Sequence, residues 1–300
     1  MRWTPLVFLF FACSAPSSGL HANLSKLRPW SADISNVQPL PPPFVADFEA
    51  GSRSLCYAAL EQSNEQTSPS LTLLSNLMDT RHYDVVVLEG IPRSLGVNSA
   101  SLRDAANQDG KEGYFRNGEN SVAIAKAEAR KVPFVGAEPD EELIKSAVSS
   151  AGYNVQDLFG LYILRLVTQW RRDGTLTRES FDIAFAQART VLGKRLALSA
   201  AQIPTLPQFN QWYELHMKAP FRVRDVRPET SEPVPDGALF SQKVAAVTDR
   251  VRSEHILRVT EEMLNRYGRV LLVFNSVHFP VQEPALESML GRPVRISDQP

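Results

Sequence analysis

The chain has 300 residues, of which 43% are hydrophobic, and a formal net charge of −1. This length suffices for one large domain or two smaller ones, and the near-neutral charge argues against a basic nucleic-acid-binding face. Two cysteines are too few for a cysteine metal cluster, and beyond the N-terminal segment no stretch has the ~20 apolar residues that span a membrane.

The first 22 residues have the pattern of a secretory signal peptide. Arg2 precedes an apolar run from Leu6 to Cys13, and small residues follow the run. Cleavage after Gly19 or Ala22 would release the protein into the periplasm. The sequence around Cys13 also has some likeness to a lipoprotein site. The alternative to cleavage after Gly19 or Ala22 is therefore lipidation of Cys13. A lipid at Cys13 is the only means by which we expect the protein to contact a membrane.

Residues 23–45 are rich in Ser, Asn and Pro, which predicts a flexible leader before a folded domain at 46–300. In that domain, short apolar runs first alternate with helical patterns. We expect strands at 54–60, 83–90 and 132–139, and helices at 68–78, 119–131 and 140–150. Cys56 is expected to be a small buried side chain of the first strand. The polar stretch 92–118 is expected to be a long loop.

The middle of the chain has a different pattern, because three helical segments follow one another between about 155 and 220. They predict an inserted helical subdomain. After it we expect a long helix at about 240–267, a strand at 269–274, a helix near 283–290 and a last strand at 293–297. The alternation of strands and helices predicts an α/β fold with a mostly parallel central sheet flanked by helices.

Polar side chains follow the carboxyl ends of the predicted strands. They are Glu61 and Gln62 after the first strand, Glu89 at the end of the second, Glu138 at the end of the third, and His278 after the strand at 269–274. Because the carboxyl ends of parallel strands lie at one edge of a sheet, we expect these side chains to meet there. Glu119 begins the helix before the third strand and is expected nearby.

Glu89 and His278 are the strongest candidates for a functional role. A carboxylate at the mouth of a buried strand is costly to desolvate unless it is paired, and imidazole suits acid–base catalysis, metal ligation or nucleophilic attack. The structural alternatives are a glutamate bonded to backbone amides and a buried histidine with satisfied hydrogen bonds. For Glu119 and Glu138 the alternative is helix capping. No GxSxG, HExxH, P-loop or strand-coupled GxGxxG motif occurs.

Four short segments carry a resemblance: "VVVLEG", "GEN…KVPFVGAEPDEE", "VRSEHILRV" and "LLVFNSVHF…LESMLGRPV". In their order along residues 45–297 the chain resembles the EreA/ChaN-like superfamily, in particular the TraB/GumN branch that includes the TIKI proteases. Members of this branch tend to carry two Gly-x-x-His motifs. Here Asn275 stands at the glycine position of the second motif, which keeps His278, and Gln62 stands where the first motif has its histidine.

The resemblance implies hydrolase chemistry, which depends on a metal in TIKI-like members and on a His/Glu pair in erythromycin esterases. Glu89 and His278 would then be the catalytic pair or ligate a divalent metal. Glu61 and Gln62 would complete the catalytic group. Glutamine cannot act as a general base and is a weak ligand beside imidazole, so this site would be an altered one.

The resemblance also implies that three residues bind the substrate, which would be a small molecule or a peptide. These are Arg252, at the arginine position of the helix before the second motif, with Glu119 and Glu138. The same fold hosts haem-binding lipoproteins. The alternative is therefore a non-catalytic protein that binds another small ligand, or binds haem through His278 or His216.

Overall fold

The computed structural model describes residues 19–112, 118–172 and 174–300, so Cys13 and most of the predicted signal peptide lie outside the described residues. The predicted α/β fold with a mostly parallel sheet is confirmed. The strands are β1 (Phe44–Ala50), β2 (Arg53–Leu60), β3 (Val85–Pro92), β4 (Phe134–Glu138), β5 (Arg269–Asn275) and β6 (Arg295–Ser297). They form one six-stranded sheet in the order β4-β3-β5-β2-β1-β6. The pairs among β2, β3, β4 and β5 are parallel, whereas β1 pairs antiparallel with β2 and β6.

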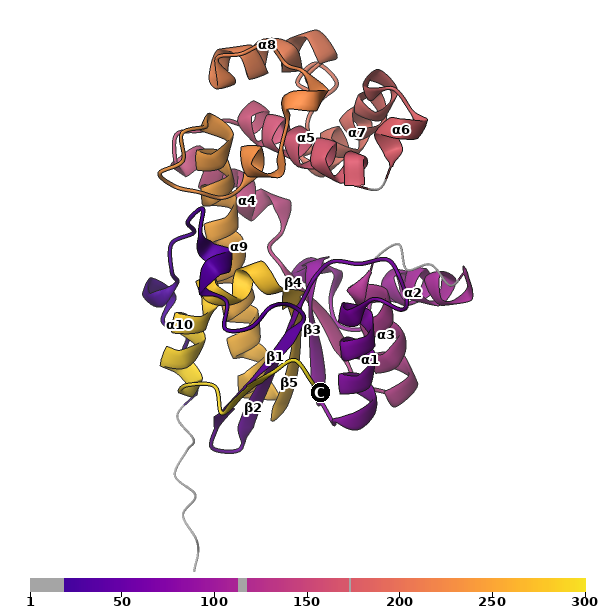
Figure 1. Ribbon diagram of the computed structural model, residues 1–300, viewed down its shortest axis with the longest axis vertical. Coiled ribbons are helices and arrows are strands. Elements are labelled where there is room, and N and C mark those ends of the chain that lie inside the picture. The colour runs from indigo at the N-terminus through magenta and orange to yellow at the C-terminus, as the bar shows by residue number, and fades with distance from the viewer. Residues whose placement is uncertain (1–18, 113–117, 173) are drawn as a thin grey trace, which may run out of the picture.

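The described residues form ten α-helices, which surround the sheet and extend beyond one of its edges (Figure 1). They are α1 (Pro69–Thr80), α2 (Ala100–Glu112), α3 (Glu119–Arg130), α4 (Glu141–Ser150), α5 (Val155–Arg172), α6 (Thr175–Arg178), α7 (Phe181–Arg195), α8 (Leu206–Met217), α9 (Phe240–Arg266) and α10 (Phe279–Leu290). Within these residues, no helix combines the length and apolar character needed to cross a membrane.

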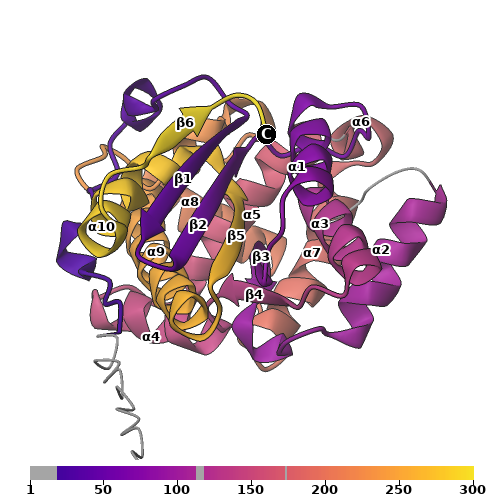
Figure 2. The same cartoon turned by 90° about the horizontal axis from the view of Figure 1, so that it is seen from below.

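The sheet is buried on both faces. In β2, Leu55 and Tyr57 pack into a core with α9 and α10, whereas Cys56 and Ala58 pack into a second core with α1 and α3. Figure 2 shows these two pairs of helices on opposite sides of the sheet. Strands buried on both faces have nearly continuous apolar sequences, which is why the sequence predicted them. Cys56 is a buried free thiol, as expected, and burial raises its pKa to about 12.

The predicted helical insertion forms a third hydrophobic core of its own, mainly from α4, α5, α7 and α8. Helix α9 joins it to the sheet. Near the start of α9, Val244 and Ala245 belong to the helical core, and further along Ile256 and Leu257 belong to the core on the sheet. Figure 1 shows the consequence: α5 to α8 lie above the edge of the sheet from which α4 and α9 extend.

The segment 23–45, expected to be a flexible leader, instead packs on the domain. Leu27 and Ile34 are buried in the core beside α10, and the Arg28 N–H donates to the Val281 carbonyl at 2.9 Å. Strand β1 begins at Phe44, so the predicted domain boundary falls inside a strand. The prolines of this segment do not prevent packing, because apolar side chains such as Leu27 and Ile34 can still be buried.

The stretch 92–118, expected to be a loop, contains helix α2. Most of its side chains are polar, and Ala106 is the one apolar side chain of the helix that is buried among the described residues. The Ser121 hydroxyl of α3 donates to Asp109 at 2.5 Å, so a polar contact ties α2 to its neighbour. A helix attached in this way lacks the apolar stripe on which the sequence prediction depends.

Candidate functional site

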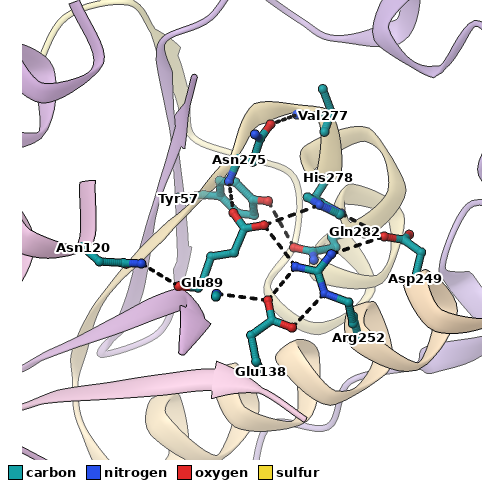
Figure 3. A network of polar contacts seen from close by, with 11 residues as sticks. Tyr57, Glu89, Asn120, Glu138, Asp249, Arg252, Asn275, Val277, His278 and Gln282 are labelled. Carbon is teal, nitrogen blue, oxygen red and sulfur yellow. Dashed lines mark hydrogen bonds and ion pairs between the residues drawn. The ribbon is translucent and has the colours of Figure 1, made fainter. Parts of the chain in front are cut away.

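The ends of β3, β4 and β5 bring Glu89, Glu138 and His278 together in one polar network (Figure 3). Gly90 shapes this edge. Its φ of 73° lies in the left-handed region that favours glycine, and the register of β3 against β4 shifts just there. As a result, the Glu89 side chain and the Gly90 N–H both take part in one polar network.

Arg252 of α9 is at the centre of this network. Its Nε and Nη2 donate to the two carboxylate oxygens of Glu138 at 2.7 and 2.6 Å, which makes a bidentate pair. Nη2 also donates to Glu89 Oε1 at 3.2 Å, and Nη1 lies 3.9 Å from Asp249 Oδ1. The arginine predicted to bind substrate is therefore already paired with three carboxylates of the protein.

The pKa values of this pair follow from burial and charge. Burial alone would raise the pKa of Glu138, but the Arg252 charge and the hydrogen bond from the Gly90 N–H outweigh it and lower that pKa to about 2. Burial would lower the pKa of Arg252, but the surrounding carboxylates raise it well above its usual value. Both groups are therefore held in their charged forms.

Glu89 is fixed by groups from three other elements. Its Oε1 faces Arg252, its Oε2 accepts the Asn275 N–H at 2.5 Å, and its carbonyl accepts the Asn120 side-chain amide at 2.9 Å. The His278 Nε2 lies 3.6 Å from Glu89 Oε1, which places the two strongest candidates within reach of each other. The bonding to a backbone amide and an arginine gives Glu89 a defined orientation at the end of its strand.

His278 lies behind Glu89. Its side chain is 8% exposed, and it contacts the rings of Trp30 and Phe274 at centroid distances of 5.5 and 5.1 Å. Its Nδ1 lies 3.6 Å from Asp249 Oδ1, which is longer than a hydrogen bond. His278 therefore has a carboxylate 3.6 Å from each ring nitrogen and aromatic rings around it, and it packs behind Glu89 without a hydrogen bond to it.

A small cavity of about 150 Å³ opens on the other side of Glu89. We call it the carboxylate cavity. Its polar lining consists of Gln62, Glu89, Glu119, Asn120 and Asn275. The predicted residues Glu89, Glu119 and Gln62 therefore do meet at one place, whereas His278 is not part of this wall.

Glu119 has the most perturbed carboxyl group of this cavity. Its Oε1 accepts the Ser63 N–H at 2.7 Å from the loop after β2. Burial is the main cause that raises the pKa of Glu119 to about 7, and the negative charge of Glu89 adds to it. At neutral pH this carboxyl group therefore exchanges between its protonated and ionised forms.

The other two residues after β2 differ from each other. Gln62 lines the carboxylate cavity, and its Oε1 accepts a hydrogen bond from Arg172 of α5 at 3.2 Å. Glu61 is exposed and lines neither this cavity nor the larger one described next, although its backbone N–H donates to the Ser70 hydroxyl at 2.9 Å. The structure thus brings Gln62 to the site but not the Glu61 side chain.

A larger cavity of about 540 Å³ lies between the sheet edge and the helical subdomain. We call it the arginine cavity. Its charged lining consists of Glu138, Glu141, Arg165, Arg195 and Arg252. Gly90 lines both cavities, so the network of Glu89, Glu138 and Arg252 lies at the boundary between them.

The predicted metal ligands, Glu89 and His278, lie near each other, but no third His, Cys, Asp or Glu completes a metal site with them among the described residues. Glu89 and Asp249 lie near opposite ring nitrogens of His278, and Glu89 Oε1 also faces the positive charge of Arg252. Among the described residues, no group of three or more His, Cys, Asp or Glu side chains is arranged to hold a metal ion. Two donors beside an arginine are fewer than the three or four protein ligands of a typical zinc site.

The residues proposed for haem do not fit an axial ligand either. The Nε2 of His278 faces Glu89, and the Nε2 of His216 lies 3.6 Å from Asp157 Oδ1. The His216 ring also stacks on Phe240, with centroids 3.9 Å apart. Neither imidazole lines the carboxylate cavity or the arginine cavity.

Several residues of the site were not predicted. Asn120, Asp249, Arg165 and Arg172 lie on helices, and their roles depend on how those helices pack. One signal was available for Arg165, because it is a single charged residue within the apolar run from Leu158 to Val167. A lone cation in a buried helical segment needs a partner or a ligand.

No protein-family model matches the chain, and neither a curated protein nor a solved structure shows significant similarity to it. The resemblance to the EreA/ChaN-like superfamily therefore remains a prediction from short segments of sequence. The fold, a site at the carboxyl ends of parallel strands and the geometry of its side chains are the basis for the proposals below.

Proposed function

We propose that the protein is an exported hydrolase of the EreA/ChaN-like type that acts on an ester or amide by carboxylate acid–base catalysis. The observation that carries this proposal is the pair of glutamates in the carboxylate cavity. Glu119 has a pKa of about 7, and Glu89 is held in place by Arg252 and the Asn275 N–H. Two carboxyl groups whose environments differ in this way are typical of acid–base pairs.

In this proposal Glu119 transfers the proton. Its carboxylate accepts a proton from a water molecule, and the water oxygen attacks the carbonyl carbon of the substrate. The bond to the leaving group then breaks, and Glu119 returns the proton to the leaving oxygen or nitrogen. Glu89 orients the water, and Arg252 and the Asn275 N–H position Glu89. The cavity of about 150 Å³ is too small for a whole drug-sized ligand, so it would admit the reacting group of a larger substrate.

The test is hydrolysis of p-nitrophenyl esters and fluorogenic peptides by wild type, Glu119→Gln and Glu89→Gln. We expect each variant to lose roughly 100- to 10,000-fold in rate, and the inflection of the pH–rate profile near 7 to disappear in Glu119→Gln. Glu128→Gln is the matched control, because Glu128 lies on the same helix at an exposed ion pair with Arg103.

Two outcomes would contradict the proposal. One is the absence of turnover with both substrate classes. The other is turnover that Glu119→Gln and Glu89→Gln leave as active as the Glu128→Gln control. A rate that is lost on dialysis against a chelator and restored by a divalent metal would instead favour the metal-dependent chemistry that the resemblance implies.

A further inference from the structure

Arg165 differs from the other charged residues of the arginine cavity because its guanidinium has no partner among the described residues. Arg252 is bound by Glu138, and Arg195 donates to Glu141 at 2.5 Å. Arg195 also lies over the Tyr162 ring, at 4.6 Å from the centroid. No hydrogen bond or ion pair of the Arg165 side chain occurs within residues 19–112, 118–172 and 174–300.

The position of Arg165 is unfavourable for a cation. Burial lowers its pKa, and the positive charges of Arg252 and Arg195 lower it further. Tyr162 and the negative charge of Asp249 offset only part of this lowering of the pKa. Arg165 is half-buried, so its guanidinium loses part of its hydration and gains no hydrogen bond from the described residues, which costs folding free energy. A bound anion would supply what the protein does not.

The rest of the lining indicates what kind of anion fits. Three arginines and two glutamates face the cavity, which leaves one positive charge for a ligand. The apolar side chains of Ile144, Leu166 and Leu192 line the same space. Tyr162, Leu166 and Gln169 project with Arg165 from one face of α5, because they follow the helical spacing of three and four residues. Glu138 and Glu141 would repel a dianion such as a phosphate monoester.

We infer that the arginine cavity binds a small amphipathic carboxylic acid, whose carboxylate is recognised by Arg165 and whose apolar part lies against α4, α5 and α7. Its volume of about 540 Å³ is within the range of small-molecule sites. This site is separate from the carboxylate cavity, so the inference does not depend on hydrolysis.

Octanoate is a suitable probe, with octanamide as its uncharged analogue and octyl phosphate as the dianionic one. We expect octanoate to raise the melting temperature of the wild-type protein by roughly 3 °C or more at saturating concentration. Octanamide and octyl phosphate should shift it much less. In calorimetry Arg165→Gln should bind octanoate at least about tenfold more weakly than wild type, and Arg165→Lys should bind with intermediate affinity.

Two measurements keep the test decisive. Arg292→Gln, which changes an exposed arginine far along the chain, should bind octanoate like wild type. Arg165→Gln without ligand should melt no lower than wild type, because the arginine that it removes has no partner in the protein. The inference is overturned if octanoate does not bind, if octanamide or octyl phosphate binds as tightly, or if Arg165→Gln binds octanoate unchanged.

Discussion

Replacing Arg252 by glutamine would leave three buried or partly buried carboxylates without their shared cation. Glu138 loses most, because both of its oxygens accept from Arg252. The lowering of the Glu138 pKa from 4.5 to about 2 is equivalent to roughly 3 kcal/mol. Removing one partner of a buried ion pair typically costs about 3–5 kcal/mol. We therefore expect Arg252→Gln to lower the free energy of unfolding by about 3 kcal/mol at pH 7.

The loss should depend on pH. In wild type the Glu138 pKa is lowered by folding, so its contribution to stability is present above about pH 4.5 and is lost as the pH falls toward 2. In Arg252→Gln, burial without the cation raises that pKa, and protonation then relieves the variant. The difference in unfolding free energy between the two proteins should therefore be largest at neutral pH and shrink on acidification.

Urea denaturation followed by circular dichroism measures both effects. Arg250→Gln is the matched control, since Arg250 lies on the same helix but pairs with Glu254 at the surface, where ion pairs contribute less than about 1 kcal/mol. If Arg252→Gln cost no more than Arg250→Gln, or if its cost did not fall between pH 7 and pH 4, the account of the buried pair would be wrong.

Three further predictions concern other parts of the chain. Glu119 has a folded pKa of about 7, above its usual 4.5, so it lowers stability as the pH rises between these values; Glu119→Gln should gain stability relative to wild type between pH 5 and pH 8 in urea denaturation. Gly118→Ala should lower the melting temperature by several degrees, because φ is 53° there and the new Cβ would lie 2.9 Å from the Ser63 carbonyl oxygen. Mass spectrometry of protein from the native host should show an N-terminus after Gly19 or Ala22, whereas an intact Met1 would contradict export.

The fold was predictable where buried residues produce a regular pattern of apolar side chains in the sequence. Strands buried on both faces appear as apolar runs, and α9 appears as one long helical pattern. Strand β1 was not predicted, although Phe44, Ala46 and Phe48 alternate into the core. The prolines just before it are typical of a flexible leader, and that pattern was followed instead. Helix α2 was missed because its polar sequence has no apolar stripe, and its position depends on tertiary contacts.

The site was predictable where it depends on topology alone. The ends of parallel strands must meet at one edge, and Glu89, Glu138 and His278 do so. Sequence could not tell that His278 lies behind Glu89, because the direction of a side chain in the turn after β5 depends on the packing of Trp30 and Phe274. Nor could the sequence show that Arg252 already donates its hydrogen bonds to carboxylates of the protein, since that depends on which face of α9 packs toward the sheet.

The charged groups at this edge of the sheet are of two kinds, which differ in the direction in which folding shifts their pKa values. One kind stabilises the fold, and the other is where function is to be expected. Glu138 and Arg252 have pKa values that folding moves toward their charged forms, so folding gains from them and they form the boundary between the cavities. Glu119 and Arg165 have pKa values that folding moves toward their neutral forms, so folding loses stability by keeping them. Each of these two lines a cavity. Residues that cost stability and face a cavity are where function is to be expected, because a ligand or a substrate can restore what folding loses there.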